Sequence, residues 1–340
     1  MLEDLRGMLH LPAEINHKTS PEPEISVIVP AYNAQNSICL LFERLLSQVY
    51  PLNQCEFIFV DNGSTDNTTK AILFICQEAQ KQNLKFRHVV ENHIQSSYAA
   101  RNQGIRCSKG KILAFTDVDC YPQPTWIADI VKLFGSLPDV GLIGGAIVAA
   151  KGQTLIEKYS SRKQILHQAR SGSHAFLPYA STANLSVRRE VFEQVGLFRP
   201  YLTTGGDADF CWRVQQGSEW QLYITEQAVV EHKHRQSLRG LRAQFRRYGK
   251  SHKYLEELYQ RAIFPPSITH ENYLQSWKKW IIKDMPSGIK RILLKKGNLL
   301  DLLVTPLDLL VAREEMLGRS LSSLPENGHH IESLDSSLEE

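Results

Sequence analysis

The chain has 340 residues, 42% of them hydrophobic, which is enough to bury a large core in one main domain with an appendage. Its 39 basic and 36 acidic residues nearly cancel, which excludes binding of nucleic acid through a global charge. The six cysteines are scattered and form no C-x-x-C pair, so buried reduced thiols are favoured over disulfides. That usage is typical of a cytosolic protein.

No segment predicts export or insertion into a membrane. The first 24 residues carry five acids and lack an apolar stretch, unlike a signal peptide. No run reaches the roughly 18 uncharged apolar residues that a spanning helix needs. We therefore expect a cytoplasmic protein that is soluble or peripheral at the inner face of a membrane.

The first half of the chain alternates strand and helix patterns. Short apolar, β-branched runs predict strands and periodic apolar spacing predicts helices: strands at 25–30, 55–61, 84–90 and 111–117, and helices at 35–47, 66–82 and 96–108, with Asp66 as an N-cap. This alternation implies an α/β fold with a mostly parallel central sheet flanked by helices. Polar clusters follow three of the strands, at the sheet edge where such folds bind ligands.

The second half is mixed and ends in helices. We expect a strand at 141–150, a strand and helix at 183–196, a loop entering a helix at 205–217, extended chain at 220–234, a basic helix at 238–260 and a leucine-rich helix near 299–317. The domain prediction is an N-terminal lead (1–23), a catalytic domain (24–235), a helical region (236–318) and a polar, disordered tail (319–340).

Asp117 and Asp119 follow the fourth predicted strand and lie two residues apart, so they would point the same way if the strand continued. Two close carboxylates raise each other's pKa unless a cation lies between them, and all-oxygen ligation favours Mg²⁺ or Mn²⁺. A solvated turn is the alternative reading of this D-x-D pattern. Asp61 and Asp66 should reach the same sheet edge, and such a cluster suits a metal-bound diphosphate.

Five stretches, in order and at the usual spacing, resemble the family 2 glycosyltransferases of the GT-A fold over roughly residues 24–250: "SVIVPAYNAQNSI", "FIFVDNGSTDNT", "SYAARNQGIRCSKGKILAFTDVDCYPQPTWI", "TANLSVRREVFEQVGLF" and "GGDADFCWRVQQG". The resemblance implies a Rossmann-like fold that binds a nucleoside-diphosphate sugar. It also implies a Mn²⁺ or Mg²⁺ ion and inversion at the anomeric carbon.

The resemblance also assigns roles to individual residues. It implies that the backbone around Pro30, Ala31 and Tyr32 holds the nucleoside, that Asp61 bonds the base, that Arg101 lies near the nucleotide, that Asp117 faces the ribose or sugar, and that Asp119 binds the metal. Simpler roles stay open for two of these. "DNGSTD" is also a good turn followed by a helix cap, and Arg101 could pair with Glu91 on the surface.

An inverting transfer also needs a base that takes the proton of the acceptor hydroxyl. The family's motif there reads G-E-D-x-D, and this chain has "GGDAD" at 205–209. Asp207 aligns with the usual base, with Asp209 as the alternative, and Asp207 could cap the following helix as well. Gly206 departs from the usual Glu, which puts the acceptor contacts of that Glu in doubt.

Two further elements complete the predicted site. "EHKH" offers His232, with His234 second, as a late histidine ligand of the metal, where an imidazole would favour Mn²⁺ over Mg²⁺. "QFRRY" resembles the family's Q-x-x-R-W element, so Gln244 and Arg247 are expected to contact the diphosphate and acceptor, although Tyr248 replaces Trp.

The predicted function is the inverting transfer of a sugar to an acceptor hydroxyl on a polysaccharide, a lipid-linked glycan or a small molecule. The basic helix could contact anionic lipid or a lipid diphosphate, or it could dock on the protein with a solvated basic face. The leucine-rich helix is expected to pack against the catalytic domain. The alternatives are a sugar-phosphate nucleotidyltransferase and a non-catalytic nucleotide-sugar-binding protein of the same fold.

Overall fold

The computed structural model describes residues 22–334, and the chain forms two compact units. The first unit comprises Met1–Val148, Leu166–His232 and Glu326–Glu340, and the second comprises Ala149–Ile165 and Lys233–Pro325. The change of unit after His232 lies close to the expected boundary at 235. The insertion of 149–165 into the second unit, and the return of the C-terminal segment to the first, were not expected from sequence.

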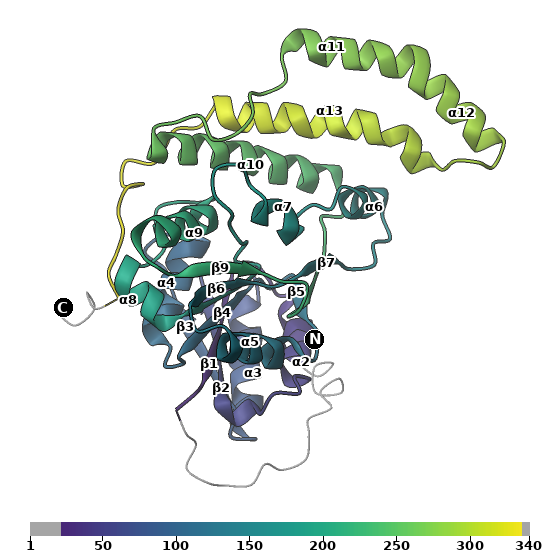
Figure 1. Ribbon diagram of the computed structural model, residues 1–340. Helices are drawn as coiled ribbons and strands as arrows, with labels where there is room; N and C mark the ends of the chain where they lie inside the picture. Colours follow the sequence, from purple (N-terminus) through teal and green to yellow (C-terminus); the bar gives the residue numbers. More distant parts are fainter. Residues whose placement is uncertain (1–21, 335–340) are drawn as a thin grey trace. The chain divides into compact units, whose positions relative to one another are not determined.

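The first unit is built on a seven-stranded sheet in the order β3-β2-β1-β4-β8-β6-β9 (Figure 1). The strands are β1 (Ile25–Ala31), β2 (Cys55–Asp61), β3 (Lys85–Val90), β4 (Ile112–Thr116), β6 (Val140–Gly144), β8 (Asn184–Arg188) and β9 (Gln221–Ile224). Only β8 runs antiparallel to its neighbours, β4 and β6, among the described pairs. The predicted α/β fold with a mostly parallel sheet is confirmed.

Helices cover both faces of this sheet: α2 (Ile38–Leu46), α3 (Thr68–Gln80), α4 (Ser97–Cys107), α5 (Trp126–Ser136), α7 (Gln168–Gly172), α8 (Arg189–Val195) and α9 (Gly206–Gly217). Alternate residues of β1 explain why both faces are apolar. Val27 packs into the core that holds α2 and α3, while Ile28 faces α4. A Cβ added to Gly104 of α4 would lie 2.5 Å from an Ile28 methyl carbon, so glycine lets this helix approach the sheet closely.

A second sheet carries part of the predicted site. It has the order β5-β10-β7, formed by β5 (Cys120–Pro122), β10 (Val230–His232) and β7 (Ile147–Ala149). β10 runs antiparallel to β5, with His232 opposite Cys120 in the register. Since β5 starts directly after the D-x-D turn, this pairing brings His232 beside Asp119, over a hundred residues away in the chain.

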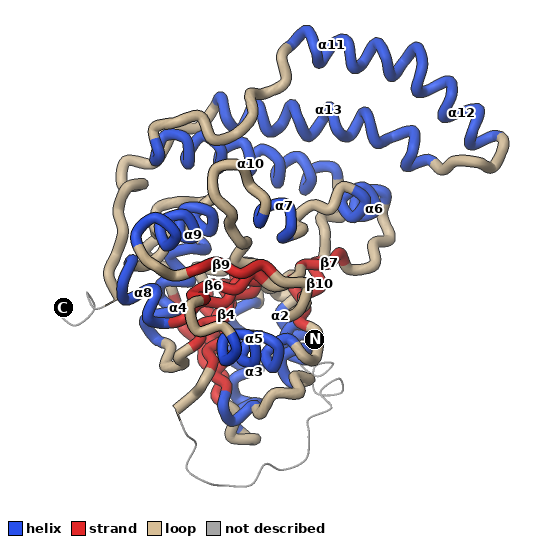
Figure 2. Tube along the Cα trace, viewed as in Figure 1, coloured by secondary structure: helices blue, strands red, loops and turns tan. Residues whose placement is uncertain are grey.

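The second unit is helical: α6 (Leu155–Arg162), α10 (Leu238–Tyr259), α11 (His270–Lys279), the π-helical turn η2 (Trp280–Asp284), α12 (Met285–Leu293) and α13 (Leu299–Ser320). Helices α10 and α13 lie side by side (Figure 2). Added Cβ atoms at Gly249 and Gly318 would overlap the backbone of the facing helix, so two glycines permit this close packing. The leucine-rich helix therefore packs on the basic helix, within the second unit.

Other local expectations need correction. Asn67, not Asp66, is the N-cap residue of α3, although the Asp66 carboxylate accepts hydrogen bonds from the backbone and side chain of Thr68. Part of the tail expected to be disordered is ordered, since Glu332 pairs with Arg106 at 2.8 Å. Residues 1–21 of the predicted lead and 335–340 of the predicted tail lie outside the described residues.

Two predictions from composition can be compared with the structure. All six cysteines are free, and three of them are buried. Among the helices of residues 22–334, none combines the length and apolar character needed to cross a bilayer.

Candidate active site

The polar clusters after β1 and β2 meet at the carboxyl edge of the sheet. Ala31 and Asp61, the last residues of these two parallel strands, are register partners. The buried Asp61 carboxylate accepts hydrogen bonds from the backbone N–H of Ser64, at 3.0 Å, and from the hydroxyl of Thr69. "DNGSTD" is thus a real turn, as the simpler reading proposed, and its hydrogen bonds hold Asp61 at the edge.

The loop after β1 presents an exposed tyrosine at this edge. Pro30 and Ala31 are buried, whereas Tyr32 is 52% exposed. The neighbouring Asn33 links this loop to the loop after β2, because its side-chain oxygen accepts from the backbone N–H of Thr65 at 2.8 Å. An exposed aromatic ring on a held loop is available to a ligand, and this is the place where the resemblance expects a nucleoside.

Arg101 is a buried cation at the same edge. It is 2% exposed, and its guanidinium donates to Asp117 Oδ1 at 2.5 Å. The alternative pairing with Glu91 is not formed, since that carboxylate accepts from the backbone N–H groups of His93 and Ile94. Arg101 therefore places a positive charge beside the first acid of the D-x-D pattern.

The condition under which the two acids of the D-x-D pattern would point the same way is not met, and the two acids have different partners. β4 ends at Thr116, so the alternation of a strand does not extend to Asp117 and Asp119. Asp117 pairs with Arg101, while Asp119 Oδ1 lies 3.8 Å from His232 Nε2. Each acid thus has its own positively charged or protonatable neighbour.

Asp119, His232 and Cys120 form a group whose potential ligand atoms lie within 4.8 Å of one another. Burial raises the pKa of the Cys120 thiol well above its usual value, and the charges of Asp119 and Asp117 raise it further. A thiol is also a soft ligand, whereas Mn²⁺ and Mg²⁺ prefer oxygen ligands. A carboxylate oxygen and an imidazole nitrogen remain, a donor pair that suits Mn²⁺ or Mg²⁺. His234 belongs to the second unit and is not part of this group.

Asp207 lies in the first turn of α9. The N-cap residue of this helix is Gly205, which has a positive φ of 79°. Its Oδ1 accepts from the backbone N–H of Ala208, at 3.0 Å, and lies 3.4 Å from the hydroxyl of Tyr98. Burial raises the pKa of Asp207. The hydrogen bond from the Ala208 N–H and the charge of Arg101 lower this pKa, but the effect of burial is larger. A carboxylate with a raised pKa is a better proton acceptor, which is the property a general base needs.

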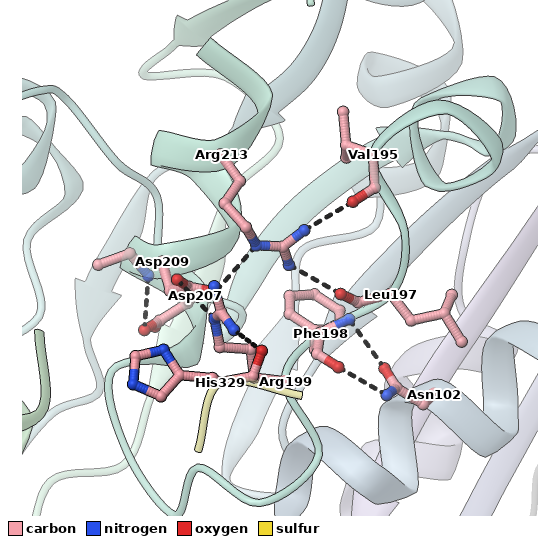
Figure 3. A network of polar contacts seen from close by, with 10 residues as sticks. Asn102, Val195, Leu197, Phe198, Arg199, Asp207, Asp209, Arg213 and His329 are labelled. Carbon is pink, nitrogen blue, oxygen red and sulfur yellow. Dashed lines mark hydrogen bonds and ion pairs between the residues drawn. The ribbon is translucent and has the colours of Figure 1, made fainter. Parts of the chain in front are cut away.

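Asp209, the alternative base, is a structural residue. Its carboxylate is fully buried and accepts from Arg199 and from Arg213, both at 3.0 Å. Figure 3 shows that Arg213 also donates to the backbone oxygens of Val195 and Leu197. The Asp209–Arg213 pair therefore connects α9 to the end of α8 and the chain that follows it. Asp207, by contrast, contacts a backbone N–H and the Tyr98 hydroxyl and, among the described residues, not an arginine.

Sequence reasoning missed Tyr98. The position of its ring explains why the structure has room only for glycine at position 206. A Cβ on Gly206 would lie 2.9 Å from three atoms of the Tyr98 ring, so the ring fills the space into which a side chain would grow. Tyr98 is buried on α4, and its ring lies beneath the Arg101 guanidinium at 5.6 Å. No sequence pattern connects positions 98 and 206, and only the fold brings α4 to the start of α9.

Replacing Gly206 with Glu, the residue common in the family, is expected to destabilise the protein by about 1–3 kcal/mol because the new side chain overpacks against Tyr98. Adding Tyr98→Ala should relieve the clash, so the double variant should lose less stability than the two single variants together. Thermal melts of the four proteins measure this coupling. A Gly206→Glu variant that melts like the parent would show that the Tyr98 ring does not limit the space.

The remaining predicted residues, Gln244 and Arg247, lie on α10 of the second unit. Gln244 is buried and donates to the Tyr248 hydroxyl at 2.9 Å. Arg247 lines a basic cavity of about 560 Å³ between α10 and α13. Their contact with a diphosphate or an acceptor stays a prediction.

The sheet with acids at its carboxyl edge, a buried arginine and an Asp/His pair is the arrangement that the resemblance to GT-A glycosyltransferases implies. The family model described as "Glycosyl transferase family 2" matches residues 26–196, and a second, "Glycosyl transferase family group 2", matches 112–312. The chain belongs to glycosyltransferase family 2 and is an enzyme of that family.

Individual relatives agree with this assignment. The chain is 34% identical over 230 residues to Glycosyltransferase AglE of Haloferax volcanii, covering 67% of this chain and 73% of that protein. The structure resembles a mannosyltransferase, PcManGT of Pyrobaculum calidifontis, solved with GDP-Man and Mn²⁺ (TM-score 0.59, 20% identity, 94% and 93% coverage). It also resembles S. aureus TarS 1–349 with UDP-GlcNAc (TM-score 0.50, 15% identity, 88% and 92% coverage). At these identities the two structures show the GT-A fold alone.

Proposed function

We propose that this glycosyltransferase moves a sugar, with inversion, from a nucleoside-diphosphate sugar to an acceptor hydroxyl, with Asp207 as the general base. One observation carries the proposal. Arg101 pairs with Asp117 at 2.5 Å and lies 5.6 Å from the centre of the Tyr98 ring, whose hydroxyl lies 3.4 Å from Asp207 Oδ1, so Arg101 and Tyr98 link the donor-side acid to the proposed base. These contacts support a shared site for Asp117 and Asp207 in the first unit.

The proposed reaction assigns one task to each group. Asp207 accepts the proton of the acceptor hydroxyl as its oxygen bonds to the anomeric carbon. The bond from that carbon to the donor's diphosphate oxygen breaks, and its electron pair leaves with the nucleoside diphosphate. Arg101 offsets the negative charge that develops on the leaving group. Attack opposite the leaving group inverts the configuration.

Recognition of the donor is assigned to the strand ends. Pro30, Ala31 and Tyr32 hold the nucleoside and Asp61 bonds the base, while Asp117, oriented by Arg101, faces the ribose or sugar. The nucleotide sugars bound by PcManGT and TarS support a donor of this class. For the acceptor we retain a polysaccharide, a lipid-linked glycan or a small molecule, and for the location the cytoplasm.

Asp119 and His232 fit a divalent ion by the chemistry of their atoms and by their 3.8 Å separation. A bound Mn²⁺ or Mg²⁺ would neutralise diphosphate charge. The main-chain pairing of β5 and β10 holds the two side chains together without a ligand. Membership of family 2 removes the nucleotidyltransferase alternative, and the intact acids argue against a non-catalytic protein.

A panel of nucleotide sugars with Mn²⁺ tests the function. The correct donor is expected to raise the melting temperature, because a ligand at 100 times its Kd stabilises the folded state by about 2.7 kcal/mol. It should also yield free nucleoside diphosphate. Asp119→Asn is the matched variant, because it keeps the size of the side chain and should lose the Mn²⁺-dependent part of the stabilisation. Failure of every donor in both assays would contradict the proposal.

A further inference from the structure

The segment α11–η2–α12 is a helical surface with an unusual composition. None of its residues is buried, and it includes exposed large aliphatic side chains, of which Ile282 is 76% and Leu293 is 78% exposed. Figure 1 shows it as one bent helical stretch that runs along α13 in the second unit. Single exposed apolar side chains are normal, but several gathered on one segment, here Leu274, Ile281, Ile282, Ile289, Leu293 and Leu294, indicate a contact surface.

The same segment is strongly basic. Residues 270–296 contain seven Lys or Arg and only two acids: Lys278, Lys279, Lys283, Lys290, Arg291, Lys295 and Lys296, against Glu271 and Asp284. No ion pair within residues 22–334 engages its six lysines. Trp277 and Trp280 lie within the same stretch. The occupant of the surface must therefore accept aliphatic groups and also offer negative charge, whereas the Trp280 indole N–H is donated to the Leu302 backbone oxygen of α13 at 3.1 Å.

This combination distinguishes between the possible occupants. Lysine is depleted in the core of protein–protein interfaces, so a lysine-rich surface is a poor fit for a second copy of the chain. Interfacial helices of membranes combine exposed Leu, Ile and Trp with Lys and Arg, whose long side chains reach the headgroups. Anionic headgroups complement the charge. The helices also lack the length and apolar character to cross a bilayer.

We propose that α11–η2–α12 binds the surface of an anionic phospholipid bilayer and lies in its plane. The inference stands on this segment alone and does not depend on the proposed transfer reaction. It concerns a different element from the basic helix α10, the membrane contact expected from sequence. Two arginines of α10, Arg242 and Arg246, pair with the buried Glu314 of α13 at 2.7 and 2.6 Å. These two charges of α10 thus serve the packing of the second unit.

Sedimentation of the full chain with vesicles tests this assignment. Binding is expected to vesicles of phosphatidylcholine with phosphatidylglycerol, to be much weaker on phosphatidylcholine alone, and to fall with added salt because exposed charges are screened. The variant Ile282→Asp/Leu293→Asp should lose at least tenfold in binding. A second variant, Lys278→Glu/Lys279→Glu/Lys283→Glu, should lose the preference for anionic vesicles.

Val49→Asp is the matched control, because Val49 is an exposed aliphatic residue of the first unit outside the proposed surface. It should bind vesicles like the parent. All variants alter exposed side chains, so unchanged thermal melts establish that they fold. The assignment fails if the parent does not bind anionic vesicles or if Ile282→Asp/Leu293→Asp binds equally well. Concentration-dependent dimerisation through the segment without vesicle binding would assign the surface to a second copy instead.

Discussion

Replacing Asp207 with Asn is expected to reduce turnover by about 10²–10⁴-fold, the usual contribution of a positioned general base. The amide has the same size but cannot accept the proton of the acceptor hydroxyl. Donor affinity should stay unchanged, because we assign the nucleotide contacts to β1, β2 and the D-x-D turn. Initial rates of nucleoside diphosphate release, together with donor-induced shifts in melting temperature, separate the two effects.

The pH dependence provides a second readout for Asp207. As pH falls, the Asp207 carboxylate protonates and activity is lost. Because burial raises the pKa of Asp207, the pH at which kcat/KM falls should lie above the ordinary pKa of an aspartate. Asp129→Asn is a suitable control, since Asp129 also lies in the first turn of a helix but outside the site. If Asp207→Asn keeps the parental rate, the base is another group and Asp207 only begins α9.

Replacing Asp209 with Asn is expected to lower the free energy of unfolding by about 3–5 kcal/mol, because it leaves two largely buried guanidinium groups without their fully buried counter-charge. Arg199 and Arg213 both donate to this carboxylate, and Arg213 also bonds backbone oxygens. The new amide can donate as well as accept, so it cannot satisfy both cations. Denaturant unfolding of the variant and the parent measures the loss.

Asp207→Asn is the matched comparison in the same unfolding experiment. Burial already disfavours the charged form of Asp207, so removal of its charge should leave the stability unchanged or raise it. Two isosteric changes two residues apart should therefore act on different quantities, one on turnover and the other on stability. Equal stability of Asp209→Asn and the parent would contradict the structural role of Asp209.

Much of the fold could be read from local patterns. The periodic residues of α2, namely Ile38, Leu41, Phe42 and Leu45, are its buried side chains. The alternation of strands and helices also predicted which polar clusters reach the carboxyl edge, because parallel strands share their direction. The boundaries were less predictable: the N-cap residue of α3 lies one residue past the predicted cap, although the Asp66 side chain still accepts from the backbone N–H of Thr68.

The candidate site divides in the same way. Motif order identified Asp61, Arg101, Asp117, Asp119 and Asp207 as candidates, and none of these assignments required a structure. The pairing of Arg101 with Asp117 rather than Glu91 depended on the packing of α4 against the sheet. The pattern also left two candidate bases open, since Asp207 and Asp209 have the same chemistry and nearly the same position in sequence.

The sequence by itself determined the fold class, the family and the residues that carry charge at the strand ends, because these follow from periodicity, strand direction and motif order. Tertiary structure alone decided which of those side chains are engaged in structural contacts and which are brought together at the candidate site. It buried Asp209 between two arginines, set Tyr98 against Gly206, and brought His232 beside Asp119 through the pairing of β10 with β5. These contacts join residues from distant parts of the chain. A local sequence pattern therefore does not show which residue will be the partner.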